Sequence, residues 1–314
     1  MGSSDLQHTA CLNCGQDQPQ PLLSTPAHMY HKAEPFSFVQ CGHCGLVYLN
    51  PQVAPEQLGQ YYPDYYVPYR GAAAWGKYHK IAAWGLAGTD KKRAQKARQQ
   101  LRKNEGHRVL DVGCGHPTFL EALAKKPGLT LTGIDFLDTG WREEPERWQG
   151  MDLHEVDPKA YQSDAPFDVI TMWHYLEHDY DPKTTLHHLL NVSHDHTRLI
   201  IEVPDYDSLS RKRYGQHWEG WHAPRHTALY TQQTLSDVLD RSGWQVEKAY
   251  KYGTMDVYAL WWMSRMEQKG LDWTQSLESE FPTFLAGKIL TMPFFSLQPW
   301  LRLGVQLVVA QPKK

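Results

Sequence analysis

Apolar residues in the last two thirds of the chain form short runs that alternate with longer amphipathic segments. Such runs, most of them almost continuously apolar, are typical of strands buried on both faces of a parallel sheet. They lie at 107–112, 129–134, 167–174, 198–203, 244–250 and 304–310. The segments between the first five have apolar residues three or four positions apart, as amphipathic helices do. This alternation predicts an α/β fold with a doubly wound sheet.

Capping residues mark where two of these helices begin. Asp181 followed by Pro182 supplies an N-cap and a first helical residue. Thr231 supplies the N-cap of a later helix, which is expected to end before Gly243. Both helices fit between predicted strands, so the local signals agree with the α/β pattern.

A basic segment precedes the first strand of the sheet. Residues 91–103 carry seven Lys or Arg and no acid, which predicts a surface helix capped by Thr89 or Asp90. Its thin apolar stripe consists of Ala94, Ala97 and Leu101. Clustered basic residues contact phosphates in nucleic-acid complexes, but a charge run is more often a solvated face. Nucleic-acid binding is therefore the less favoured interpretation.

Four of the five cysteines form two Cys-x2-Cys pairs near the start of the chain. Cys11 and Cys14 make the first pair, Cys41 and Cys44 the second, and each pair precedes a glycine that permits a tight knuckle. This spacing is typical of a zinc ribbon, in which four thiolates enclose a structural Zn²⁺. Unliganded cysteines, or replacement of one ligand by His43, are the alternatives.

A glycine turn follows the first predicted strand of the sheet. The segment Asp111-Val112-Gly113-Cys114-Gly115 leads into a helix, and the next strand ends at Asp135. Glycines let the backbone approach a ligand, because no Cβ stands in the way. An acid at the tip of the neighbouring strand can accept hydrogen bonds from two ribose hydroxyls at once. The pattern indicates a nucleotide-type site.

These motifs resemble those of a known family. Val-Leu-Asp-Val-Gly-Cys-Gly at 109–115, the acid at Asp135, Phe-Asp-Val-Ile at 167–170 and Leu-Glu-His at 176–178 resemble class I S-adenosylmethionine-dependent methyltransferases over roughly 105–250. The Cys-x2-Cys-Gly-Leu-Val-Tyr-Leu-Asn-Pro block resembles the zinc-ribbon subset, which includes sugar C-methyltransferases. The core also resembles ubiquinone-pathway O-methyltransferases.

The resemblance implies a Rossmann-like, seven-stranded methyltransferase sheet whose last strand is antiparallel, and S-adenosylmethionine as cofactor. The implied cofactor-binding residues are Asp111, Gly113, Cys114, Gly115, Asp135, Asp152 and Trp173. Asp152 is expected in a loop near the adenine amine. The family usually has a glycine where this chain has Pro117. Because proline fits the start of a helix without losing a hydrogen bond, the turn is expected to survive.

The same resemblance points to catalytic candidates. His178 matches a position where related sugar C-methyltransferases carry a histidine suggested as base, and histidine titrates near neutrality. His222 and His226 lie in the polar, aromatic loop 204–230, which covers the acceptor in the related fold. Arg225 is a candidate clamp for a carboxylate or phosphate. A structural role for His178, and an Arg225 that ties the loop to the sheet, are the open alternatives.

The predicted organisation has five parts. They are a zinc ribbon and aromatic linker (1–70), basic linker helices (71–104), the cofactor-binding core (105–254), a helical insertion (255–303) and the last core strand (304–314). The tyrosines of the linker either stack on a ligand or, as the favoured interpretation, pack the ribbon onto the core. The insertion is rich in Trp, Phe and Met. A lid over a large acceptor and a membrane-facing surface are open interpretations, and a cap buried against the core or a second copy is favoured.

Composition narrows the functional classes. With 314 residues and 41% hydrophobic content, the chain is a folded protein of about two domains. Its 32 basic and 35 acidic residues create no overall attraction to nucleic acid or membranes, and the absence of a leader pattern favours the cytoplasm. The leading hypothesis is methyl transfer to oxygen or carbon of a sugar, quinone-like or lipid-linked molecule. An RNA methyltransferase and a non-catalytic cofactor-binding subunit are the alternatives, and the oligomeric state is not predicted.

Overall fold

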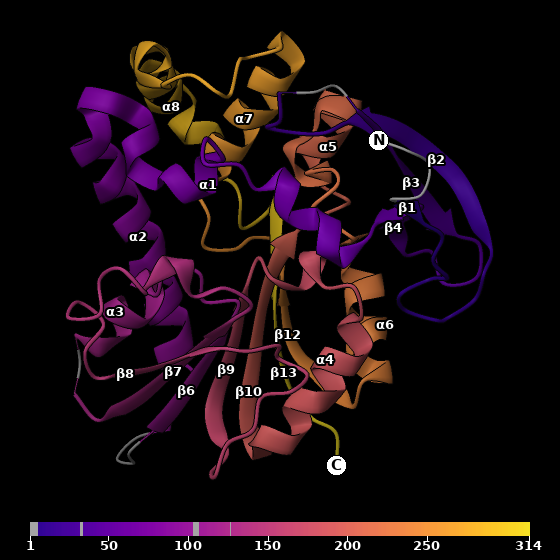
Figure 1. Cartoon of the computed structure of the whole chain (residues 1–314), viewed down its shortest axis with the longest axis vertical. Helices are drawn as coiled ribbons and strands as arrows, with labels where there is room; N and C mark the ends of the chain where they lie inside the picture. Colours follow the sequence, from indigo (N-terminus) through magenta and orange to yellow (C-terminus); the bar gives the residue numbers. More distant parts are fainter. Residues whose placement is uncertain (1–5, 32–33, 103–106, 126) are drawn as a thin grey trace.

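A seven-stranded sheet forms the centre of the computed structural model, which describes residues 6–31, 34–102, 107–125 and 127–314. The strands run in the order β12-β13-β10-β9-β6-β7-β8 (Figure 1). Their bounds are β6 His107–Val112, β7 Leu129–Asp135, β8 Met151–Glu155, β9 Phe167–Trp173, β10 Ser193–Pro204, β12 Trp244–Tyr250 and β13 Val305–Pro312. The strands from β10 to β8 are mutually parallel, whereas β13 is antiparallel to both β10 and β12. The predicted Rossmann-like sheet is confirmed.

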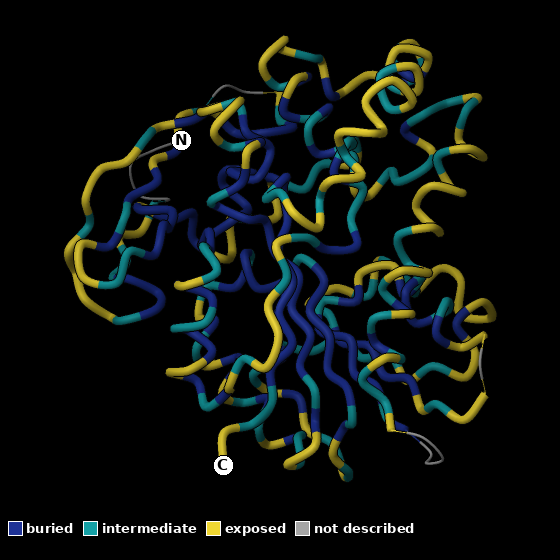
Figure 2. Tube along the Cα trace, turned by 180° about the vertical axis from the view of Figure 1, so that it is seen from behind, coloured by how far each residue is buried: buried dark blue, intermediate teal, exposed yellow. Residues whose placement is uncertain are grey.

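Each face of this sheet carries its own helices. Ile200 of β10 belongs to the cluster formed with α2 (His79–Arg98) and α3 (Thr118–Ala124). Its neighbours Leu199 and Ile201 belong to the cluster formed with α4 (Pro182–His188) and α6 (Gln232–Arg241). The central strands are consequently buried on both sides (Figure 2). Burial on both faces explains why these strands are almost continuously apolar.

Most of the predicted helix starts are correct. The side chain of Asp181 caps α4 by accepting the N–H of Thr184 at 3.2 Å, and Thr231 forms a capping box at the start of α6. The basic helix is the exception. It begins at His79, so the predicted start at Thr89 or Asp90 is wrong, because no proline interrupts the preceding turns and the helix simply continues through them.

The inner side of α2 uses some of its basic residues for packing. Arg98 donates to the carbonyls of Ala122 and Leu123 at the end of α3, at 2.9 and 2.7 Å. The ammonium of Lys96 lies 4.4 Å from the centre of the Tyr250 ring. Part of the basic run therefore holds the helix to the core.

The cysteine-rich segment shares a sheet with the loop 204–230. This four-stranded sheet has the order β11-β4-β3-β2. Its strands are β2 Pro19–Pro26, β3 Pro35–Cys41, β4 Val47–Leu49 and β11 Ala228–Leu229, and a small ladder joins β1 Leu6–Gln7 to β5 Gln52–Val53. Ala228 pairs with Tyr48, and Leu229 with Val47. The ribbon is therefore joined to the core by backbone pairing.

The insertion folds into α7 (Val257–Lys269), η8 (Glu278–Glu280) and α8 (Phe281–Phe295). Trp261 of α7 packs edge to face against Phe294 and Phe295 of α8. The other side of α8 is open: Leu290 is 79% exposed, and Trp300 just beyond the helix is 72% exposed. This chain therefore buries α7, where Trp262 and Met266 pack with Tyr66, but leaves one side of α8 uncovered. Within the described ranges, no helix combines the length and the apolar character that spanning a bilayer requires.

The remaining short helices connect these units. They are η1 Pro55–Tyr61, α1 Val67–Arg70, η2 Gly71–Tyr78, η3 Asp138–Gly140, η4 Leu176–His178, η5 Leu189–Val192, α5 Leu209–Tyr214, η6 Gly215–His217 and η7 Glu219–Trp221, where η denotes a 3₁₀ helix. Of these, η3, η4 and η7 contribute residues to the site described next.

Candidate functional site

The glycine turn after β6 adopts the conformation that its residues predict. Gly113 and Gly115 have φ angles of 73° and 48°, in the region that favours glycine. The N–H groups of Gly113 and Cys114 donate to the carbonyl of Ile134, at 2.8 and 3.1 Å. A Cβ added to Gly115 would meet no atom within 4 Å, so the backbone there borders open space. A ligand can approach the turn from that side.

Asp135, the last residue of β7, closes this turn. Its Oδ2 accepts the N–H of Gly115 at 2.9 Å. Burial raises the pKa of the carboxyl, while the N–H groups of Gly115 and Leu137 act in the opposite direction by favouring the ionised form. Because a carboxylate has about four acceptor positions, Asp135 can also accept hydrogen bonds from two hydroxyls. The side chain fits a ribose diol.

Pro117, at the start of α3, and Gly140, in η3, flank the glycine turn. Pro117 is the N-cap of α3, and its carbonyl accepts the N–H of Glu121 at 2.9 Å, so the helix starts without a lost hydrogen bond. Gly140 of η3 lies so close that an added Cβ would be 2.1 Å from the carbonyl oxygen of Gly115. The proline in place of the usual glycine therefore leaves the turn intact.

Asp111 lies beneath the turn as a buried carboxyl. Its Oδ1 accepts the hydroxyl hydrogen bond of Thr171 at 2.6 Å, which joins β6 to β9. Burial raises the pKa of Asp111 to about 7, although the Thr171 hydrogen bond and the nearby Arg93 charge act in the opposite direction. Asp111 therefore connects β6 to β9 just before the glycine turn.

Asp152 is the second residue of β8, so the expectation that it belongs to a loop is wrong. Its exposed side chain is 2.9 Å from Nε2 of His154. The strand continues beyond it, and the N–H of Val156 donates to the carbonyl of Asp135 at 2.9 Å. Asp157 is the residue directly after Val156, just beyond the end of the strand. The misassignment arose because an edge strand with alternating polar residues resembles a surface turn in sequence.

Trp173 ends β9 and packs against two other elements. Its ring lies 5.4 Å from that of Phe119 on α3 and 5.3 Å from the guanidinium of Arg93 on α2. Arg93 also lies 3.9 Å from Glu202 Oε1. The indole N–H of Trp173 is buried without a hydrogen-bond partner among the described residues. The partly buried guanidinium of Arg93 and the unpaired indole N–H of Trp173 thus lie close together at the ends of β9 and β10.

An acid and histidine network occupies the carboxyl ends of β9 and β10. His174 has a φ of 56°, with Nδ1 3.0 Å from Glu177 Oε1 and Nε2 3.2 Å from Glu202 Oε1. Burial by itself would lower the pKa of His174, but the two carboxylates raise it to about 9. Glu202 also accepts the N–H and the hydroxyl of Thr254. The network holds a protonated imidazole between two carboxylates.

The structure brings together the three histidines that the sequence singled out. The ring centre of His226 lies 4.6 Å from that of His178 and 4.9 Å from that of His222. His178 and His226 each direct Nδ1 at a backbone carbonyl, of Arg225 at 3.1 Å and of Gly220 at 2.8 Å. Because a carbonyl only accepts, both rings carry their lone pair on Nε2. Burial lowers the pKa of all three histidines and favours their neutral form.

Tyrosines of the linker cover this histidine cluster. The hydroxyl of Tyr66 lies 2.6 Å from His222 Nε2, and that of Tyr62 lies 3.3 Å from His178 Nδ1. Tyr69 stacks on Tyr62 at 5.8 Å and is 45% exposed. The aromatic run therefore packs onto the core, as the favoured interpretation expected, and it also provides the wall of the site.

Arg225 ties the loop to the ribbon and the linker. The side chain is fully buried, and it donates from Nη1 to the carbonyl of Tyr61 at 2.5 Å and from Nη2 to the carbonyl of His28. Its guanidinium also lies 4.7 Å from the centre of the Tyr66 ring. The interpretation of Arg225 as an anion clamp is wrong, because backbone carbonyls occupy both ends of the fork. Arg225 joins the loop to the ribbon and the linker, and not to the central sheet.

Several buried polar residues of the site were not recognised in the sequence. Glu202 carried a usable signal, because an acid inside the apolar run Leu-Ile-Ile-Glu-Val is unusual. Glu219 of η7 is also buried, which raises its pKa to about 8, and its position in a polar loop gave no such signal. Arg93 was hidden among the other basic residues of its helix.

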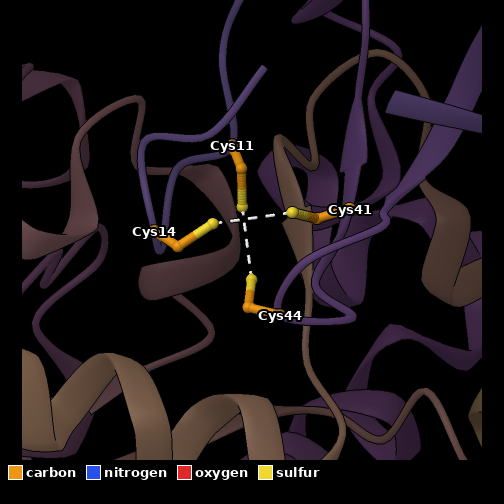
Figure 3. Close-up of side chains that lie close together, drawn as sticks. All are labelled: Cys11, Cys14, Cys41 and Cys44. Carbon is orange, nitrogen blue, oxygen red and sulfur yellow. Dashed lines mark hydrogen bonds between the residues drawn. The ribbon is translucent and has the colours of Figure 1, made fainter. Parts of the chain in front are cut away.

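The four cysteines of the ribbon direct their sulfur atoms at one point (Figure 3). Sγ of Cys11 lies 3.5 Å from that of Cys44, and Cys14 and Cys41 are equally close. Four sulfurs bound at about 2.3 Å to a tetrahedral zinc ion would be about 3.8 Å apart. The observed spacing is close to that value. The cluster therefore fits one ion with four ligands and no open position.

Comparisons with known proteins agree with this geometry. A family model described as a methyltransferase domain matches residues 86–249, just over half of the chain. The ubiquinone biosynthesis O-methyltransferase of Pseudomonas fluorescens (strain Pf0-1) is 34% identical over 87 residues, which are 26% of this chain and 37% of that protein. The corresponding enzyme of Idiomarina loihiensis is 36% identical over 84 residues, or 25% and 34% of the two chains. The matched segment thus spans little more than a third of these relatives.

A solved structure shares the overall fold. The 1,6-didemethyltoxoflavin-N1-methyltransferase of Burkholderia thailandensis, with 1,6-didemethyltoxoflavin and S-adenosylhomocysteine bound, superposes with a TM-score of 0.50. The two chains are 13% identical, and the match covers 94% of this chain and 100% of the other. At this identity the similarity establishes the fold alone.

Proposed function

The chain belongs to the methyltransferase domain family, and from this premise we propose that it transfers a methyl group from S-adenosylmethionine to a small hydroxylated molecule. One observation carries the proposal: the glycine turn and the histidine cluster meet at the same edge of the sheet. A Cβ on Gly113 would lie 2.3 Å from the ring of Tyr175, which is three residues before His178. Cofactor and acceptor sites are therefore adjacent.

Three side chains around the turn suit the cofactor. Asp135 accepts hydrogen bonds from the ribose hydroxyls, and Asp157 takes the role near the adenine amine that was expected of Asp152. Arg93, beside Trp173, offers a positive charge to the carboxylate of the methionyl group. When bound, the sulfonium supplies an electrophilic methyl group and leaves as a neutral thioether. The protein has to orient the acceptor and remove its proton.

His178 and His226 are the best placed proton acceptors. Burial favours the neutral form of both, and because their Nδ1 atoms donate to backbone carbonyls, the lone pairs are on Nε2. His222 is less suited, since its Nε2 already lies 2.6 Å from the Tyr66 hydroxyl. As the methyl group arrives at an acceptor oxygen, one of the two free Nε2 atoms takes up the proton of that oxygen.

The walls of the site favour a ring-shaped acceptor with hydroxyl groups. Tyr62 and Tyr69 offer aromatic faces, and the carboxyl groups of Glu177 and Glu219 have oxygens that can accept hydrogen bonds from hydroxyls. A quinone-like or sugar acceptor has both features, and the names of the relatives also describe small-molecule methyltransferases. The inward-facing basic residues of α2 weigh against a nucleic-acid arm.

The four cysteines bind a structural Zn²⁺ in this proposal. Their sulfur spacing suits a tetrahedral ion, and a closed site leaves no position for a substrate. The ion stabilises the ribbon, which in turn positions β11 and the histidine-bearing loop. Zinc therefore supports the acceptor site without taking part in the chemistry.

Mass spectrometry of the reaction mixture tests the proposal. The purified protein is incubated with S-adenosylmethionine and fractionated extracts that contain quinone-like, sugar and lipid-linked metabolites. We expect S-adenosylhomocysteine to form together with one product that is 14 mass units heavier, the mass of an added CH2. Replacing His178 and His226 with Asn should lower kcat and leave cofactor affinity unchanged. Failure of the folded protein to bind either adenosyl compound in calorimetry would refute the proposal.

A further inference from the structure

A second group of metal-ligating side chains lies apart from the four cysteines. Glu177, His178 and His226 each contribute one possible ligand atom, and these atoms lie within 4.8 Å of one another. Glu177 and His178 are in η4, directly after β9, whereas His226 comes from the loop that precedes β11. Glu177 and His226 are buried and His178 is partly exposed, so an ion has access to the group.

Both imidazoles have the hydrogen bonds that metal-binding histidines usually have. In such sites the nitrogen that does not bind the metal donates to a carbonyl or carboxylate, which orients the ring and leaves the other nitrogen free. His178 and His226 donate in this way to the carbonyls of Arg225 and Gly220. The neighbouring His222 differs, because its Nε2 is occupied by the hydroxyl of Tyr66. It is also not a member of the group.

Glu177, the third member of the group, has an unused carboxylate oxygen. The residue is fully buried, and its Oε1 lies 3.0 Å from His174. Its Oε2 is buried and has no hydrogen-bond partner in the part of the chain that the structure describes. A buried carboxylate oxygen without a partner is unfavourable, and such groups are rare in folded proteins. A cation bound to Oε2 would remove this cost.

We propose that Glu177, His178 and His226 bind one divalent transition-metal ion in addition to the ion of the cysteine cluster. Two imidazoles and one carboxylate suit Zn²⁺, Mn²⁺ or Fe²⁺, and three protein ligands leave coordination positions open. The metal-binding proposal does not depend on the proposed function, but the role of the metal does. In that role, an acceptor hydroxyl fills an open coordination position. The ion, in place of an imidazole, then favours release of the hydroxyl proton to water.

Metal binding by the full-length protein tests this inference without any acceptor. Equilibrium dialysis should give two zinc ions per chain, one in each site. In protein whose cysteine site already holds zinc, a titration with Mn²⁺ followed by electron paramagnetic resonance should show one further saturable ion. Mn²⁺ prefers nitrogen and oxygen ligands to thiolates, so this signal reports on the second site alone. A single zinc ion per chain and no saturable Mn²⁺ binding would overturn the inference.

Matched variants identify the ligands. His226→Ala and Glu177→Gln should each weaken Mn²⁺ binding at least tenfold, while His222→Ala, which alters a histidine in the same cluster, should bind Mn²⁺ as the wild type does. Calorimetry with S-adenosylhomocysteine confirms that each variant is folded. Wild-type binding in the first two variants, or an equal loss in His222→Ala, would also overturn the inference. If two ions bind but no acceptor is methylated, the proposed function fails and the metal site stands.

Discussion

Gly115 donates its backbone N–H to Oδ2 of Asp135 over 2.9 Å, so one carboxylate links the turn after β6 to the end of β7. The N–H of Leu137 lies 3.4 Å from the other oxygen of the same carboxylate. These contacts orient the side chain before any ligand is present. A preoriented carboxylate binds hydroxyls at a lower entropic cost than a mobile one.

Replacing Asp135 with Ala should therefore weaken binding of S-adenosylhomocysteine by about 1–3 kcal/mol, the usual cost of losing hydrogen bonds to a charged group. Isothermal titration calorimetry measures the change. Asp152→Ala is the matched control, because this acid is exposed on β8, where it pairs with Thr132, three residues before Asp135. We expect unchanged affinity for the control. Unchanged affinity in Asp135→Ala would exclude the ribose-binding role.

Arg225→Ala should destabilise the whole protein, since it removes a fully buried side chain that donates to the carbonyls of Tyr61 and His28. The expected loss is about 2–5 kcal/mol in the free energy of unfolding, from the lost buried hydrogen bonds and the cavity left by the large side chain. Urea denaturation measures it. Arg213→Ala, an exposed arginine in the same loop, should change stability by less than about 0.5 kcal/mol. A stable Arg225→Ala protein that has lost only acceptor binding would restore the anion-clamp interpretation.

Asp111 should make stability depend on pH below neutrality. Its carboxyl ionises near pH 3.8 when unfolded, but burial raises the folded pKa to about 7. Between these values folding takes up a proton, so this residue's contribution to stability falls as pH rises, by about 1.6 kcal/mol from pH 5.5 to 7. Asp111→Asn keeps an oxygen that can accept the Thr171 hydrogen bond and removes the titration.

Urea denaturation of the wild type and Asp111→Asn at several pH values measures this contribution. The stability of the wild type relative to the variant should decline between pH 5.5 and 7 and then level off. Both proteins share every other titrating group, so their difference isolates residue 111. A difference that stays constant across this range would contradict the raised pKa.

Removing metal from the cysteine cluster should loosen β11 as well as the ribbon. Ala228 and Leu229 pair with Tyr48 and Val47 of the ribbon strand β4, so loss of ribbon structure takes away their partner. After treatment with a chelator, we expect amide hydrogen exchange at residues 228–229 to become at least tenfold faster, with exchange in β6 as the internal control. Unchanged exchange in β11, despite measured loss of zinc, would show that the ribbon holds its shape without the ion.

Local sequence signals predicted the individual strands and the glycine turn well, because a single segment of the chain specifies each of them. Asp181 caps its helix as expected, and Gly113 and Gly115 have the positive φ angles that their positions require. Strand burial on both faces also left a clear apolar signature. The cysteine spacing was equally informative, since the pair geometry depends only on neighbouring residues.

Contacts between distant segments limited the prediction of the site. Arg225 meets its partners Tyr61 and His28 only after the loop and the ribbon have packed together, so the sequence offered clamp and tie as equal possibilities. The charge of His174 likewise depends on Glu177, three residues away, and on Glu202, which lies 28 residues away on the next strand. The prediction that Asp152 lies in a loop was wrong for a different reason: a half-exposed edge strand and a turn have similar sequence polarity.

The pairing of β11 with β4 limits how this protein can be divided. A recombinant fragment beginning at residue 105 would keep all seven strands of the central sheet but would leave β11 with an unpaired edge and Arg225 without its two carbonyls. Unpaired edges promote aggregation and buried unpaired arginines promote unfolding. The cysteine-rich segment thus supports loop 204–230 through backbone pairing and through Arg225, and crystallographic or biochemical work on this protein is best done with both parts in one chain.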